Sequence, residues 1–387
     1  MDCSGPAQRR AGVKVEFYRH QLGAAELQSV EQTLQSVFLT TGPRTAQFER
    51  TFAEWLGGGE AVGTSSCTAA LHLALSALGI GPGDEVIVPA MTFIATVTPV
   101  WFVRARPVLC DVDPATGLLD PEEVKRRMTP RTRAVIPVHL YGVMADMKAL
   151  AQTCRERGVA LLEDSAHCIE GSRDGVRPGQ LSDAACFSFY ATKNLTCGEG
   201  GAVLTRTPSL AEHLRRLRLH GMSRNAAARH SGPFAHWDMD ELGFKYNMGD
   251  IQAALLLPQL PLLNERLTRR EAIARRYEQA FSALGVQVPS VPQGARSARH
   301  LFTIRIPDGG RDRVAAALPR MGVGCAVNYR AVHTLAYFRR RLRHRPEDFP
   351  NALRFGEETL SLPFYPSLTD EEIDFVVGCV EQALIAS

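Results

Sequence analysis

AVGTSSCTAALHLAL, residues 61–75, is the stretch that decides the fold of this chain. It contains a short apolar strand, a turn of small hydroxyl residues and then a helix with apolar periodicity. The N-terminus of a helix carries free N–H groups and partial positive charge, which suits a phosphate. Ser66 and Thr68 are the hydroxyls that we expect at such a seat, although ordinary helix capping also explains Ser and Thr there.

The alternation of short strands and longer helices continues on the C-terminal side of this stretch. Runs rich in β-formers predict strands at Glu85–Val88, Pro107–Val112, Ala134–His139 and Val159–Leu162. Helices are expected at Thr68–Leu78, Pro121–Arg127 and Met147–Arg157. This pattern is typical of an α/β fold with a mostly parallel central sheet and helices on both faces. In such sheets ligands bind at the carboxyl ends of the strands.

The sheet is expected to continue and then to give way to a second region. Two more strands are predicted at Ala185–Phe189 and Gly201–Thr205, and a helix at Ser209–Leu219. Long helices at Ile251–Leu263 and Glu265–Leu284 precede strands near Leu301–Ile306 and Val323–Tyr329. We predict a large α/β domain over residues 14–262, a smaller C-terminal α+β domain over residues 263–387 and a disordered tail over residues 1–13.

The composition excludes several classes of protein. The 387 residues carry a net charge of only +3, and basic clusters such as Arg339–Arg345 are better explained as solvated helix faces than as a nucleic-acid site. No apolar stretch is long enough for a membrane span or a signal peptide, so we expect a cytoplasmic protein. Nine scattered cysteines form no CxxC pair, which argues against both a disulfide framework and a metal site.

Lysine is scarce in this sequence, which makes each lysine informative. The chain has Lys14, Lys125, Lys148, Lys193 and Lys245. The first three lie in charged or terminal surroundings that are typical of surface residues. Lys193 lies instead in the loop between two predicted strands, FSFYATKNLTCGEGG, among apolar and small residues. Desolvation there would lower its pKa and permit a Schiff base with a carbonyl group.

A Schiff-base lysine needs an electron sink, and the pyridine ring of pyridoxal phosphate is one when a carboxylate partners its nitrogen. Asp164 comes after the apolar run Val159–Leu162, so the end of a strand would project it into the ligand crevice. An Asp at that position also caps the next turn of the chain in many proteins. His167 lies close enough to touch the cofactor ring, although a single His is more often a structural hydrogen-bonding residue.

A series of motifs extends these signals over nearly the whole chain. They are FLTTGPRTAQFE (residues 38–49), TAALHLALSALGIGPGDEVIVPAMTFIAT (68–96), PVHLYG (137–142), LLEDSAH (161–167), DAACFSFYATKNLTCGEGG (183–201), LRLHGMSR (217–224), GFKYNMGDIQAAL (243–255) and SLPFYPSLTDEEI (361–373). In order and length they resemble the DegT/StrS-type sugar aminotransferases, a family of fold-type-I pyridoxal-phosphate enzymes in the aspartate aminotransferase superfamily. The resemblance implies that fold, pyridoxal 5'-phosphate as cofactor, and amino transfer from an amino acid, usually glutamate, to a keto-sugar that is most often nucleotide-linked.

The resemblance also implies roles for particular residues. Lys193 would hold the cofactor and shuttle a proton between the cofactor and substrate carbons. Asp164 would pair with the pyridinium nitrogen, and His167 would lie beside the ring oxygen. The remaining matches to cofactor-binding positions are Ser66, Cys67, Thr68 and Ser188 at the phosphate seat and Phe93 over the ring face. Asn247 matches a residue that reaches the phosphate of the neighbouring subunit, which implies a homodimer with shared active sites.

Two positions refine these implications. The family usually has glycine where this chain has Cys67, so we expect a reshaped but usable phosphate seat. Relatives that remove a hydroxyl group from a sugar have histidine in place of Lys193, so transamination is favoured over dehydration.

The substrate is less well defined by the sequence. Segments that resemble substrate-side loops contain His220, Arg224, Asn328 and His333, and Arg or His would suit a diphosphate. Each of these residues is equally explained as a surface or interface residue. Two alternatives remain open: a keto-cyclitol aminotransferase of the aminoglycoside type, and a non-catalytic regulatory homologue.

Overall fold

The centre of the molecule is one large β-sheet. The computed structural model describes residues 14–223 and 236–385, and within them seven strands form this sheet. They are β1 (Glu60–Thr64), β2 (Glu85–Pro89), β3 (Arg106–Cys110), β4 (Thr132–Val135), β5 (Ala160–Asp164), β7 (Ala184–Ser188) and β8 (Gly201–Thr205). The order across the sheet is β1-β8-β7-β5-β4-β2-β3. Among these described strands β8 alone runs opposite to the other six, which confirms the predicted mostly parallel sheet.

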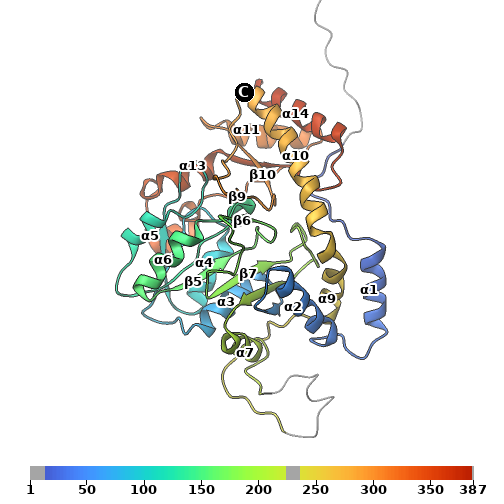
Figure 1. Ribbon diagram of the computed structural model, residues 1–387. Coiled ribbons are helices and arrows are strands. Elements are labelled where there is room, and N and C mark those ends of the chain that lie inside the picture. The colour runs from blue at the N-terminus through green and yellow to red at the C-terminus, as the bar shows by residue number, and fades with distance from the viewer. Residues whose placement is uncertain (1–13, 224–235, 386–387) are drawn as a thin grey trace, which may run out of the picture.

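Both faces of the sheet are covered, because successive side chains of a strand point to opposite faces. In β2, Val86 and Val88 join one core cluster, whereas Ile87 between them joins another. The first cluster includes Leu71 and the second includes Leu150, each from a covering helix. These helices surround the sheet in Figure 1: α2 (Pro43–Trp55), α3 (Cys67–Ala77), α4 (Ile94–Phe102), α5 (Pro121–Arg127), α6 (Met147–Arg157) and α7 (Pro208–Leu217).

The C-terminal region forms a second body of structure. Helix α9 (Asp250–Leu256) and a 3-10 segment (Leu257–Leu262) lead into the long helix α10 (Leu263–Ala283). At the top of Figure 1, α10 meets the pair β10 (Phe302–Arg305) and β11 (Thr359–Leu362), with α11 (Gly310–Ala317) and α14 (Asp370–Ile385). The other elements are α1 (Ala24–Leu34), which runs beside α9, β6 (Ser172–Arg173), β9 (Ala295–Arg296), α12 (Ala336–Leu342) and α13 (Pro350–Glu358).

Packing between the two regions crosses the predicted boundary at residue 263 in both directions. Val15, near the start of the described chain, lies in the core cluster of the C-terminal region and bridges to Val323. Conversely, Phe338 and Phe355 lie in a core cluster of the central sheet. The division into two domains therefore stays a prediction. Within the described residues, none of the helices is sufficiently long and apolar to cross a membrane.

Three predicted elements differ from the structure. The strand expected at Ala134–His139 is shifted, because β4 spans Thr132–Val135 and Val138 makes only an isolated bridge to Asp164. The strand expected at Val323–Tyr329 is wrong, because this segment makes only isolated bridges, one of them from Ala326 to Ser361. The backbone of this segment hydrogen-bonds to side chains as well as to β11. The carbonyl of Asn328, for example, accepts a hydrogen bond from the Tyr141 hydroxyl. The helix expected at Ile251–Leu263 is interrupted after Leu256, because Pro258 and Pro261 have no N–H to donate to an α-helical ladder.

Candidate active site

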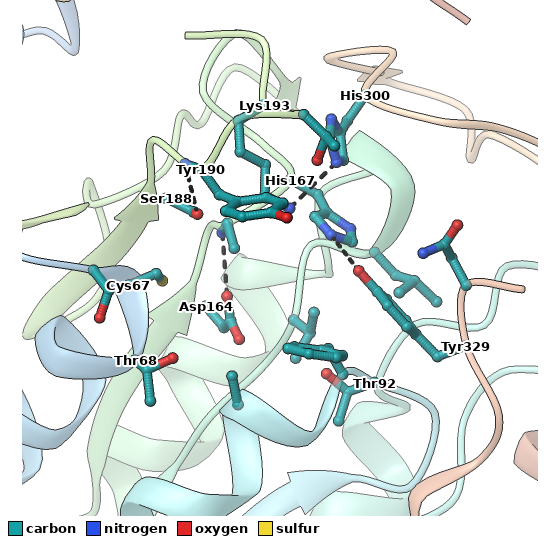
Figure 2. Close-up of a pocket in the computed structure, with 18 of the residues that line it drawn as sticks. Cys67, Thr68, Thr92, Asp164, His167, Ser188, Tyr190, Lys193, His300 and Tyr329 are labelled. Carbon is teal, nitrogen blue, oxygen red and sulfur yellow. Dashed lines mark hydrogen bonds between the residues drawn. The ribbon is translucent and has the colours of Figure 1, made fainter. Parts of the chain in front are cut away.

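A cavity of about 510 Å³ lies at the carboxyl ends of the parallel strands, where the fold predicts a ligand. Asp164 ends β5, Ser188 ends β7, and α3 begins at Cys67 directly after the turn that leaves β1. Figure 2 shows these elements converging on the cavity, which we call the Lys193 cavity. Its lining includes nine residues predicted from the sequence: Ser66, Cys67, Thr68, Phe93, Asp164, His167, Ser188, Lys193 and Asn328.

Lys193 reaches the Lys193 cavity from the loop between β7 and β8. Its Nζ lies 3.3 Å from Nε2 of His300 (Figure 2). Burial lowers the pKa of Lys193 to about 8, although the negative charge of Asp164 acts in the opposite direction. At pH 7 about a tenth of this lysine is therefore an uncharged amine, far more than for a lysine in water, and this is the form that attacks a carbonyl carbon.

Asp164 is only 5% exposed and is fixed by two donors. The Thr96 hydroxyl donates to its Oδ2 over 2.7 Å, and the Ala166 N–H donates to its Oδ1 over 3.1 Å. Burial raises the pKa of Asp164, while these hydrogen bonds and the charge of Lys193 oppose that rise. A buried carboxylate of this kind is stabilised by a cationic ring nitrogen in the same cavity. The position thus fits a protonated pyridine ring.

His167 and two aromatic side chains form another wall of the Lys193 cavity. Burial, with the nearby charge of Lys193, holds the pKa of His167 well below its usual value, so the ring is neutral. Its Nδ1 accepts the N–H of Tyr141, so its Nε2 carries the proton and donates to the Tyr329 hydroxyl over 3.0 Å. The Tyr329 ring lies 5.1 Å from that of Phe93, which is 48% exposed and faces the cavity. This wall suits a flat aromatic ligand.

The start of α3 forms one end of the Lys193 cavity. Ser66 is the N-cap, and its Oγ accepts the N–H of Ala69. Glycine is required at position 201 of β8, since a Cβ there would overlap the backbone of Ser66 and Cys67. That close approach fixes the first turn of α3 at the cavity, where Thr68 also lies. Free N–H groups at such a turn fit a phosphate ester.

Cys67 stands in the first turn of α3, where glycine was expected from the resemblance. It is 8% exposed, belongs to the core cluster beneath the helix and also lines the Lys193 cavity. Burial raises the pKa of its thiol well above the usual value, so the side chain is uncharged. The turn keeps its N-cap and its position with Cys67 in place.

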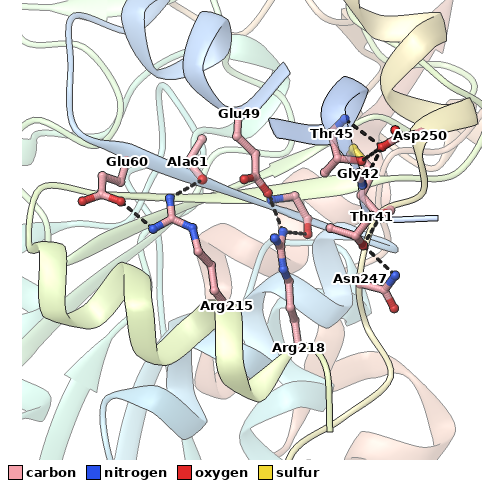
Figure 3. Close-up of polar contacts among 12 residues, drawn as sticks. Thr41, Gly42, Thr45, Glu49, Glu60, Ala61, Arg215, Arg218, Asn247 and Asp250 are labelled. Atoms are coloured by element: carbon pink, nitrogen blue, oxygen red, sulfur yellow. Dashed lines mark hydrogen bonds and ion pairs between the residues drawn. The ribbon is translucent and has the colours of Figure 1, made fainter. Parts of the chain in front are cut away.

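The other predicted residues lie outside the Lys193 cavity. Asn247 donates from Nδ2 to the Thr41 hydroxyl over 2.7 Å (Figure 3). Together with Thr41, His220 and Lys245 it lines a separate hollow of about 360 Å³, which we call the Asn247 hollow. His333 is buried beside Phe349, and its Nε2 contacts the carbonyl of Pro346. Arg224 lies outside the described residues.

Sequence reasoning missed several residues of the Lys193 cavity. Thr92, which lines the cavity, and Thr96, which holds Asp164 from behind it, come after the end of β2, so the rule that ligands bind beyond strand ends would have indicated them. His300 and Tyr329 come from the C-terminal region, and no motif or periodicity marks them. Only the folded chain brings them to Lys193, from 107 residues away in the case of His300.

Comparison with known proteins identifies the relatives of this chain. Residues 20–381 match the DegT/DnrJ/EryC1/StrS aminotransferase family. The spore coat polysaccharide biosynthesis protein SpsC of Bacillus subtilis (strain 168) is 41% identical over 366 residues, which cover 93% of this chain and 94% of SpsC. The aminotransferase TlmJ from Streptoalloteichus hindustanus superposes with a TM-score of 0.88 at 36% identity, over 96% of this chain and 99% of TlmJ. The PLP-form of Spr1654 from Streptococcus pneumoniae gives 0.90 at 29% identity, over 97% of this chain and 99% of Spr1654.

These likenesses agree with the chemistry of the Lys193 cavity. Spr1654 has been solved in a PMP-form as well as a PLP-form, which are the amine and aldehyde states of one cofactor. The predicted fold and the predicted cofactor, pyridoxal phosphate, are confirmed, and the protein is a pyridoxal-phosphate-dependent transaminase rather than a regulatory homologue. The chain belongs to the DegT/DnrJ/EryC1/StrS family of sugar aminotransferases.

Proposed function

We propose that the protein moves an amino group from glutamate to a nucleotide-linked keto-sugar at the Lys193 cavity. The observation that supports this most directly is a single cavity of about 510 Å³ lined by a lysine, a buried carboxylate and the start of a helix. These three features match the aldehyde carbon, the ring nitrogen and the phosphate of the cofactor. When bound, pyridoxal phosphate supplies the electron sink that makes a substrate C–H bond acidic.

In this proposal each residue of the chain has a separate task. Lys193 holds the cofactor covalently and, once released, moves a proton between carbon atoms with its amine. Asp164 keeps the ring nitrogen protonated through its negative charge. His167 orients the ring through its fixed neutral tautomer. Ser66, Thr68 and Ser188 hold the phosphate, and Phe93 covers one face of the ring.

We also propose that the active unit is a homodimer with shared sites. Asn247 does not line the Lys193 cavity of its own subunit and instead contributes to the Asn247 hollow. A polar amide in a separate hollow with His220 and Lys245 is suited to reach the phosphate region of a second copy. All eight described cysteines are free, which agrees with a reducing compartment such as the cytoplasm.

The substrate side of the Lys193 cavity contains a polar group available to a sugar. The Oδ1 atom of Asn328 is buried and has no hydrogen-bond partner among the described residues. A sugar hydroxyl would satisfy it, since a buried polar atom without a partner is costly. The name of SpsC refers to polysaccharide biosynthesis, and amino sugars are natural components for such a pathway.

A substrate experiment tests this proposal. Protein loaded with pyridoxamine phosphate is offered a nucleotide-linked keto-hexose, the same keto-hexose without its nucleotide and a keto-cyclitol, and the amine product is measured by mass spectrometry. We expect kcat/KM for the nucleotide-linked sugar to exceed that for the free sugar by about 100-fold, because charge-assisted contacts to the diphosphate are lost. Preference for the keto-cyclitol, or no reaction with any of the three, contradicts the proposal. For the donor half-reaction, glutamate is compared with aspartate and alanine.

A further inference from the structure

Lys193 has a neighbour whose role the proposed function does not include. The ring of His300 is 5% exposed and lies 4.4 Å, centroid to centroid, from the ring of His167. Its Nε2 is 3.3 Å from the Lys193 amine (Figure 2). Either Nζ of Lys193 or Nε2 of His300 could donate in this contact. The residues that contact Nδ1, on the other side of the His300 ring, determine which of them does.

The amide of Asn194 can adopt only one orientation. Its Nδ2 lies 3.0 Å from Oε2 of Glu170 and 2.9 Å from the carbonyl oxygen of Ala298, and both of these are acceptors. The two amide hydrogens therefore point at them, and Oδ1 faces Nδ1 of His300 over 3.3 Å. Since Oδ1 can only accept, Nδ1 of His300 must carry the proton.

Glu170 is itself held as an acceptor. It pairs with Arg270 of α10, and the two residues are only 6% and 2% exposed. A carboxylate that accepts from a buried guanidinium acts as an acceptor toward its other neighbours as well. The order of donors and acceptors is thus fixed from Arg270 through Glu170 and Asn194 to His300.

The consequence for Lys193 depends on the charge of His300. Burial, together with the charge of Lys193, holds the pKa of His300 well below its usual value, so the ring carries one proton only. With that proton on Nδ1, the bare Nε2 faces the lysine amine and accepts its N–H. A donated N–H directs the amine, which otherwise turns freely at the end of a long flexible side chain.

We propose that His300 is a positioning residue for Lys193, held in one tautomer by Asn194, Glu170 and Arg270, and that it orients the lysine amine whenever that amine is free. This inference rests on the proposed role of Lys193 in proton transfer and adds a device that makes the transfer efficient. Orientation of a reacting group contributes strongly to rate, and misplacement by about 1 Å costs about 100-fold.

Three variants and one control test the inference. His300→Phe keeps a ring against His167 but removes the acceptor, whereas His300→Gln restores an acceptor. Asn194→Leu leaves His300 in place and releases its tautomer. Thr196→Val is the matched control, because Thr196 is buried in the same loop and its hydroxyl bonds to the backbone of Phe189 and Gly198.

The first measurement is the single-turnover rate with glutamate at saturating cofactor. We expect a fall of about 100-fold for His300→Phe with KM changed less than about threefold, and a smaller fall for Asn194→Leu. His300→Gln is expected to recover about tenfold of the loss, and Thr196→Val to stay within about twofold of the wild type. If His300→Phe does not fold, His300→Gln and Asn194→Leu still carry the comparison with the control.

The second measurement uses cofactor-free protein. Lys193 is labelled with acetic anhydride across a pH series, and the labelled peptide is measured by mass spectrometry. A neutral acceptor stabilises the ammonium form of lysine, so its removal in His300→Phe should lower the labelling midpoint below that of the wild type. The variant would then be labelled faster at pH 7 although it transaminates more slowly.

The two measurements separate positioning from a merely structural role. Other ionisable groups around the amine are unchanged in every variant, among them Cys67, Asp164, His167, Tyr190, Glu199, Arg266, Arg270 and Tyr329. Loosened packing would admit water and move the midpoint up, toward about 10.4 for free lysine. An upward shift, or a His300→Phe rate equal to that of Thr196→Val, overturns the inference. A wild type that binds cofactor but never reacts with any donor instead overturns the proposed function, and the labelling result still decides the role of His300.

Discussion

One substitution at Asp164 separates the effect of its negative charge on the reaction rate from the effect of its size and shape. Asp164→Asn keeps one oxygen that can accept the Ala166 N–H, places an amide NH2 where Oδ2 accepts the Thr96 hydroxyl, and removes the negative charge. We expect the rate of amino transfer from glutamate to fall about 10²–10³-fold, because the ring nitrogen loses its ionic partner. Cofactor binding should remain, since Lys193 and the start of α3 are unchanged. Stopped-flow absorbance during a single turnover measures the rate.

Thr96→Val is the control for this substitution. It removes one hydrogen bond to Asp164 and leaves the carboxylate, so the expected loss of rate is less than about tenfold. An Asp164→Asn protein whose rate stays within about twofold of the wild type would show that the charge of Asp164 is not used.

The residues found from the sequence share a simple property. Asp164 and Ser188 end parallel strands, and Lys193 lies in the loop directly after one, so strand periodicity alone locates them at the ligand-binding edge. Thr96 obeys the same rule. His300 and Tyr329 obey no local rule, because their position depends on how the C-terminal region packs onto the sheet.

Among the elements, α2 has an unusual N-terminal cap. Its N-cap residue, Gly42, has no side chain, and Asp250 of α9 takes over the task (Figure 3). One carboxylate oxygen of Asp250 accepts the N–H groups of Gly42 and Thr45 over 2.8 and 2.9 Å and the Thr45 hydroxyl over 2.7 Å. The carboxylate therefore joins α2 to α9 and supports the adjacent Thr41, which holds Asn247.

Asp250→Ala is expected to lower the free energy of unfolding by about 2–3 kcal/mol, because buried N–H groups lose a charged acceptor. Denaturant-induced unfolding monitored by circular dichroism measures the loss. Asp250→Asn keeps an acceptor and should lose less. Asp370→Ala is the control at an exposed position. It removes two surface ion pairs, and the free energy of unfolding should fall by less than about 1 kcal/mol. Equal losses for Asp250→Ala and Asp370→Ala would contradict the assigned cap.

The element boundaries show where sequence patterns stop being informative. The apolar periodicity of residues 251–263 continues past Leu256, but the prolines at 258 and 261 force a change to 3-10 geometry. The β-rich composition of residues 323–329 predicts a strand, yet side-chain contacts such as Tyr141 to Asn328 take the place of a ladder. In the first case proline chemistry overrides the helical pattern, and in the second case tertiary contacts override the strand preference. Apolar periodicity reports neither of these constraints.

For the whole molecule, the proposed shared sites predict complementation between inactive chains. Lys193→Ala and Asn247→Ala chains are co-expressed with different tags, and the mixed dimer is purified. One of its two sites then combines an intact Lys193 with an intact Asn247 from the other chain, so about half of the wild-type activity should return. Each homodimeric variant serves as the control. Activity no higher than the mean of the two variants would show that Asn247 acts within its own subunit or not at all.

The central claim is that Lys193 binds pyridoxal phosphate and that the loaded protein accepts an amino group. The most direct measurement is the visible absorption spectrum of purified protein with added pyridoxal phosphate, before and after glutamate, for the wild type and Lys193→Ala side by side. We predict a band in the wild type that depends on Lys193 and is replaced by the spectrum of pyridoxamine phosphate when glutamate is added. A wild-type spectrum identical to that of Lys193→Ala would contradict the account.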